Sequence, residues 1–154
     1  MTDQTSELDR RIVVGVDGSP CSKSALRWAM VQAKLTGATV DAVVAWQDPI
    51  AYGYGMGFGW ATPMTYAKDD MLALAQKSLD EAIAEVAGRL DQPVEVLSRV
   101  VQGHPVEVLM EAAVGAHSLV VGTRGHGGFA GILLGSVSQH CVQHAPCPVT
   151  VIPQ

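Results

Sequence analysis

The stretch RIVVGVDGSP, residues 11–20, contains a short strand, a turn and the first residues of a helix. Its β-branched residues favour a strand over 11–16. Asp17 and Gly18 favour a turn immediately after that strand. Ser19 is a suitable N-cap, and Pro20 suits the first position of a helix. A strand that passes through a tight turn into a helix is the basic unit of an α/β protein. We therefore expect this unit to recur along the rest of the chain.

Strands and helices are expected to alternate along the remaining sequence. After the first strand at 11–16, β-branched runs predict strands at 39–46, 94–101, 118–121 and 147–152. Capping residues and apolar residues at three- and four-residue spacing predict helices over about 20–36, 67–89, 103–114 and 136–144. Runs such as VVGV and LVVG lack polar alternation, as expected of strands buried on both faces. The pattern predicts an α/β fold, an open doubly wound parallel five-stranded sheet of Rossmann-like type with strand order 3-2-1-4-5 and four helices.

Composition limits the kinds of partner that the chain can have. The 154 residues suit one domain, predicted over 11–154 after a disordered polar tail at 1–10. The net charge of -5 and the absence of a Lys/Arg cluster argue against nucleic acid as a partner. No apolar run is long enough for a membrane span, and the first residues do not resemble a secretion signal. With three cysteines, too few for a disulfide framework, we expect a cytoplasmic protein.

The stretch GTRGHGGFAGILLGS, residues 122–136, is the strongest indication of a ligand site. It follows the predicted fourth strand, whose carboxyl end is where open parallel sheets bind ligands. Gly122 and Gly125 have the freedom to adopt positive φ or to let a phosphate approach the backbone. Gly135 and Ser136 then begin a helix whose unpaired N–H groups favour an anion. We therefore expect main-chain amides at 122–125 and 135–137 to converge on a phosphate chain, and Gly122→Val with Gly125→Val to abolish binding while leaving the fold intact.

Three segments together resemble the universal stress protein family, in its small, single-domain, ATP-binding form. They are VVGVDGSPCSKSALRWA near the start, GHP at 103–105, and VVGTRGHGGFAGILLGSVSQHCVQHAPCPVTVI near the end. The resemblance extends from Ile12 to Ile152, and the last segment contains the family's ATP-binding pattern. It implies ATP with Mg²⁺ as the bound cofactor, and a homodimer joined through the last strand, from Cys147 to Ile152. Pairing of that edge strand with its twin would protect it.

The resemblance also implies a role for each residue of the nucleotide site. Asp17 would lie beside the ribose and phosphates and hold the metal ion. Adenine would meet the backbone of Ala45, near the end of the second strand. The other expected contacts flank the nucleotide or enclose its phosphates and ribose: Gly15, Val16, Gly122, Thr123, Arg124, Gly125, Gly135, Ser136 and Val137.

Several of these residues have simpler explanations. Asp17 has a second reading as a turn former, and Arg124 as a solvated charge. The pattern GHGGFA at 125–130 fits a dinucleotide fingerprint but follows the wrong strand and lacks the acidic residue expected downstream. The histidines and cysteines of HCVQHAPC, residues 140–147, suggest a metal site, although burial of Cys147 explains that cysteine equally well.

Three classes of function remain open on this sequence. The chain is a nucleotide-binding regulatory protein, a slow ATPase or phosphotransferase, or a dimeric scaffold without a nucleotide. Phosphoryl transfer needs a placed base and compensating positive charge, and no lysine lies in the glycine stretch. Binding is therefore favoured over catalysis. The segment 47–66, which contains YGYGMGFGW, lacks helical periodicity and is the candidate for a part that moves on binding.

Overall fold

Strands and helices alternate from one end of the chain to the other in the computed structural model, which describes residues 10–47, 68–124 and 134–154. The elements in chain order are β1 (Arg11–Gly15), α2 (Pro20–Thr36), β2 (Thr39–Trp46), α3 (Lys68–Ala87), β3 (Val96–Gln102), α4 (Pro105–Ala113), β4 (Ser118–Gly122), α5 (Ser136–His144) and β5 (Val149–Ile152). The expected tail at 1–10, apart from Arg10, lies outside the described residues, as do most of the segment 47–66 and Gly125.

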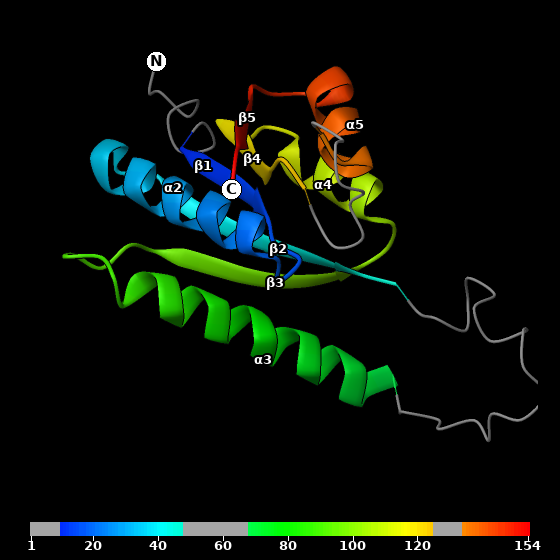
Figure 1. Ribbon diagram of the computed structural model, residues 1–154, viewed down its shortest axis with the longest axis horizontal. Coiled ribbons are helices and arrows are strands. Elements are labelled where there is room, and N and C mark those ends of the chain that lie inside the picture. The colour runs from blue at the N-terminus through cyan, green and yellow to red at the C-terminus, as the bar shows by residue number, and fades with distance from the viewer. Residues whose placement is uncertain (1–9, 48–67, 125–133) are drawn as a thin grey trace, which may run out of the picture.

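The five strands form one parallel sheet in the order β3-β2-β1-β4-β5. This confirms the predicted doubly wound architecture and its strand order. The chain moves from β1 outward to β3, then crosses back to place β4 on the other side of β1. Figure 1 shows α2 and α3 together on one side of the sheet, with α4 and α5 together on the other. The carboxyl ends of β1 and β4 therefore flank the point at which the strand order reverses.

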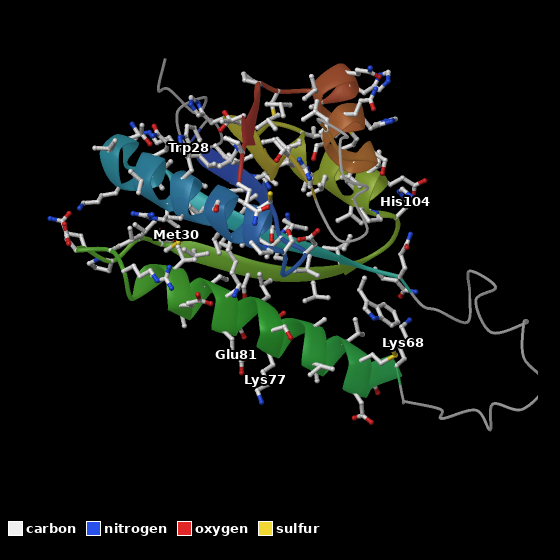
Figure 2. All side chains as sticks on the ribbon, viewed as in Figure 1. Trp28, Met30, Lys68, Lys77, Glu81 and His104 are labelled. Atoms are coloured by element: carbon white, nitrogen blue, oxygen red, sulfur yellow. The ribbon has the colours of Figure 1, made fainter. Side chains whose placement is uncertain are left out.

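Neighbouring residues of each central strand point into different cores. Ile12 and Val14 of β1 pack with α2 and α3, where Met30 is almost fully buried (Figure 2). Val13 packs instead with α4 and α5, around Leu109. Because both faces are covered, β1 and β4 are apolar after their first residues, Arg11 and Ser118, as in other buried parallel strands. The absence of polar alternation noted in the sequence has this physical cause.

The element boundaries differ from the sequence prediction by a few residues. The strand β1 ends at Gly15, one residue early, and β3 begins at Val96 instead of residue 94. The helix α4 begins at Pro105, since His104 is its N-cap and accepts a hydrogen bond from the amide of Val106 (Figure 2). The last strand begins at Val149, two residues later than predicted, directly after a proline that has no amide to donate to a sheet.

A buried carboxylate connects three strands near their amino ends. Asp41 of β2 is 1% exposed and accepts two hydrogen bonds from Arg99 of β3, at 2.8 and 2.7 Å. It also accepts one from Arg11 of β1, at 3.0 Å. Arg11 in turn donates to the carbonyl of Val114, the C-cap of α4. The neighbouring Asp41 carboxylate raises the pKa of Arg99 above its usual value. No motif in the sequence indicates that Asp41, Arg99 and Arg11 come together.

Candidate functional site

The turn after β1 places the side chain of Asp17 at the edge of the sheet where the strands end. This edge is called the carboxyl edge below. The amide of Val16 donates to the carbonyl of Val43, which continues the sheet for one more residue. The Asp17 side chain is exposed and accepts a hydrogen bond from the amide of Ser19 at 2.9 Å, while Gly18 takes a φ of 81°. The turn-forming reading of Asp17 is thus confirmed. The side chain is also exposed at this edge of the sheet.

The first turn of α2 is capped by a serine side chain. The side chain of Ser19 caps the helix, as predicted, by accepting a hydrogen bond from the amide of Ser22 at 3.2 Å. The Ser22 hydroxyl donates to the carbonyl of Ser19 and accepts from the amide of Asp17 at 3.3 Å. The sequence did not single out Ser22, because a capping box has Glu or Gln, not serine, three residues after the N-cap. These bonds fix the turn and occupy the amide of Ser22, which is therefore not a donor to a ligand.

Gly122, the last residue of β4, lies directly against the first turn of α2. A Cβ atom added there would lie 2.7 Å from the Cβ and 2.9 Å from the carbonyl carbon of Cys21. Gly122 does not have a positive φ. The glycine is therefore required by close packing of strand and helix, whichever ligand the site binds. The expectation that Gly122→Val leaves the fold intact is wrong, because a valine side chain cannot fit against Cys21.

The two ends of the glycine stretch are held together by main-chain hydrogen bonds. The amide of Gly135 donates to the carbonyl of Thr123 at 2.7 Å, and the amide of Thr123 donates to Ile152 of β5. The hydroxyl of Ser138, on the first turn of α5, donates to the carbonyl of Gly122 at 2.6 Å. Ser138 was not singled out in the sequence, where nothing local distinguishes it. These contacts place the start of α5 beside the end of β4.

The same contacts narrow the set of amides that can bind an anion. The amides of Thr123 and Gly135 are already bonded within the protein, so the expectation that they converge on a ligand is not met. At α5, by contrast, the N-cap is Gly135 and no side chain caps the helix. The first amides of a helix have no intrahelical acceptor, which leaves those of Ser136 and Val137 as donors. Of the two helix ends near β4, α2 is capped and α5 is suited to an anion.

The remaining predicted residues lie around this edge at different depths. Gly15 faces Leu109 of α4, whose nearest methyl group would be 3.0 Å from an added Cβ. Ala45 pairs with Val101 of β3 and packs on the α4 and α5 side of the sheet. Arg124 is exposed. The hydroxyl of Thr123 and the Sγ of Cys21 are 3.6 Å apart, so Thr123 lies between the first turns of α2 and α5.

The histidines and cysteines of HCVQHAPC do not come together around one metal ion. Cys141 is fully buried in the core beneath α5, whereas His140 and His144 are exposed on the same helix. Burial raises the pKa of the Cys141 thiol to about 11, so the thiolate that binds metals is disfavoured at neutral pH. Among residues 10–47, 68–124 and 134–154, no group of three or more His, Cys, Asp or Glu side chains could hold a metal ion.

The fold defines a doubly wound α/β protein, a class that binds ligands at the switch point of its sheet, here the edge where β1 and β4 diverge. The model of the universal stress protein family matches residues 9–153, and the chain belongs to this family. It is 33% identical over 151 residues to a universal stress protein of Mycobacterium tuberculosis, covering 93% of this chain and 48% of the relative. The chain thus spans about half the length of this relative. A universal stress protein of Thermus aquaticus is 32% identical, with 93% and 98% of the two chains covered.

Solved structures show the same fold. A universal stress protein in complex with cAMP is 27% identical, with a TM-score of 0.68 over 94% of this chain and 97% of that one. A universal stress protein from Archaeoglobus fulgidus in complex with dAMP is 23% identical, with a TM-score of 0.61 over 94% and 98%. At that identity the second likeness supports the fold alone. Of the helices that the structure describes, none combines the length and apolarity needed to cross a bilayer.

Proposed function

We propose that this chain binds an adenine nucleotide, ATP with Mg²⁺, at the carboxyl edge between β1 and β4, and acts as a nucleotide-dependent regulator of a stress response. The observation that carries the proposal is the uncapped start of α5, held beside the end of β4 by the bond from Gly135 to Thr123. A helix end with unpaired amides stabilises a phosphate group. Its position at the switch point of the sheet is where such ligands bind.

Each predicted residue then has a role that fits its place. The amides of Ser136 and Val137 bind phosphate oxygens, and the exposed guanidinium of Arg124 adds positive charge. The exposed carboxylate of Asp17 supplies an oxygen ligand of the kind that Mg²⁺ prefers. Gly15 and Val16 line the edge beside the nucleotide, and Ala45 meets the adenine. Thr123 and Gly125 contact the phosphates and ribose, and Gly122 shapes the wall through its packing on Cys21.

The choice of nucleotide rests on two further arguments. A solved relative is in complex with cAMP, which supports an adenine nucleotide as the ligand class. The glycine stretch carries the family's ATP-binding pattern, which favours a triphosphate. Three free cysteines in the described part of the chain fit a reducing compartment, and we propose a cytoplasmic location.

A single substitution tests the assignment of α5 without unfolding it. Ser136 is the first residue of α5 after the N-cap, where proline is well tolerated and removes only an amide that lacks a helical acceptor. Gly135 before it is extended, with ψ of 163°, as a residue preceding proline prefers. We expect Ser136→Pro to weaken ATP binding by roughly 10- to 100-fold, the loss of one hydrogen bond to a charged group.

Ser136→Ala is the matched control, because it removes the hydroxyl and keeps the amide. Isothermal titration calorimetry with ATP, AMP and cAMP would compare both variants with the unaltered chain. A Ser136→Pro protein that binds ATP as tightly as Ser136→Ala would show that α5 is not the phosphate site. Phosphate release that requires Asp17 would instead assign the protein to the ATPases.

A further inference from the structure

The outer face of α5 presents a pair of histidines that the proposed nucleotide site does not use. His140 and His144 are four residues apart on one helix, and both are exposed. Their ring centroids lie 4.5 Å apart, with the ring planes inclined by 43°. Residues at this spacing are neighbours on a helix surface. The helix backbone thus holds the two imidazoles side by side.

Two neighbouring imidazoles suit a particular class of metal ion. Imidazole nitrogen is a good ligand for Zn²⁺, Cu²⁺ and Ni²⁺, whereas Mg²⁺ and Ca²⁺ prefer oxygen. His144 also lies in the last turn of α5, where the negative end of the helix dipole favours a cation. Both ligands come from a single helix, so little conformational entropy is lost when the second imidazole binds after the first.

We propose that His140 and His144 form a surface site for one divalent transition-metal ion, Cu²⁺ or Zn²⁺, with water completing the coordination. The site is separate from the nucleotide edge, since these residues lie in the second half of α5 and the proposed phosphate donors in its first turn. It does not depend on Cys141, which is buried beneath the helix. Because the ion binds the helical form of this segment, its binding stabilises the native state.

Titration of untagged full-length protein with CuCl₂ and ZnCl₂, followed by calorimetry, tests the site. We expect saturable binding that His144→Ala weakens by roughly tenfold or more, because the second ligand no longer binds intramolecularly. His117→Ala, which removes an exposed histidine outside α5, is expected to leave binding unchanged. Titration with MgCl₂ is expected to give no binding at this pair.

Two double variants with the same number of histidines test the geometry. Gln143→His in the His144→Ala background puts the imidazoles three residues apart on one face, and we expect it to restore binding. Val142→His in that background puts them two residues apart on different faces, and we expect no restoration. Gln143 is exposed and Val142 is 49% exposed, so both substitutions fit the helix.

The opposite results would overturn the site. Unchanged metal affinity in His144→Ala, restoration by Val142→His, or an equal loss in Cys147→Ser would each place the ion elsewhere. Absence of saturable Cu²⁺ and Zn²⁺ binding by the unaltered chain would do the same. Circular dichroism of each variant verifies that the helices are retained.

Discussion

Gly122 shows how a single residue can look like a ligand contact and also be required for packing. Its missing side chain lets the end of β4 touch the backbone of Cys21, one hundred residues earlier in the chain. The turn after β1 depends on the same helix start, through Ser19 and Ser22. The wall of the proposed site is therefore part of the protein's packing. We expect substitutions there to lower the stability of the fold, whether or not they also weaken ligand binding.

Two alanine substitutions at the residue scale separate these effects. We expect Gly122→Ala to lower the free energy of unfolding by about 1–3 kcal/mol, the usual cost of overpacking. Gly15→Ala should cost less, because the added Cβ meets the terminal methyl groups of Leu109, which can rotate away. Urea unfolding followed by circular dichroism measures both. If Gly15→Ala proves the more destabilising of the two, the packing of Gly122 on Cys21 is not as described.

At the scale of the elements, Asp41 connects β1, β2 and β3. Asp41→Asn keeps the shape of the side chain but leaves the guanidinium groups of Arg11 and Arg99 without their carboxylate. Removing one partner of a buried ion pair costs 3–5 kcal/mol, and partial exposure of both arginines puts the expected loss near the lower end, at about 3 kcal/mol. Urea unfolding provides the measurement.

Lys77→Gln is the matched control for this prediction. It removes the charge of an ion pair with Glu81 that lies on the outer side of α3 (Figure 2), where both side chains are about 70% exposed. Exposed pairs contribute about 0–1 kcal/mol, so a small change is expected. Comparable losses in Asp41→Asn and Lys77→Gln would mean that the buried cluster does not hold the strands together.

The elements were predictable from the sequence because their signals are local. Ser19 and Pro20 identify the start of α2, and Gly37, with φ of 70°, ends it. Alternation and handedness predict a doubly wound parallel sheet, and the observed order 3-2-1-4-5 is one of several that both rules allow. The Asp41 cluster was not predictable, because its partners Arg11 and Arg99 lie 30 and 58 residues away in the sequence. An aspartate within an apolar run does not indicate which distant arginines it will contact. The position of the glycines correctly indicated the edge where β4 ends. That Gly122 is required for packing on Cys21 could be learned only from the fold.

On the scale of the whole molecule, β5 forms one edge of the sheet, and no strand in the described part of the chain pairs with its outer side. The carbonyl of Pro148, just before β5, accepts a hydrogen bond from the amide of Leu119 in β4, and the carbonyl of Ile152 accepts one from the amide of Thr123, just after β4. Since successive residues of a strand point their amides to opposite sides, the amides of Val149 and Val151 point to the open edge. An open edge of β-branched residues is a site for pairing with another chain. We infer that two copies of the protein associate here, through the strand that runs from Cys147 to Ile152.

This geometry allows the dimer to be tested without breaking the sheet. Val151→Pro removes an amide that points outward and leaves the hydrogen bonds to β4 in place. An edge strand tolerates proline at such a position. In analytical ultracentrifugation we expect the unaltered chain to sediment as a dimer and the variant as a folded monomer. Thr150→Pro is the contrasting control, since residue 150 faces β4 and its substitution should destabilise the fold itself. A Val151→Pro protein that remains dimeric would exclude pairing through β5, because the partner strand would have lost the central donor on which that pairing depends.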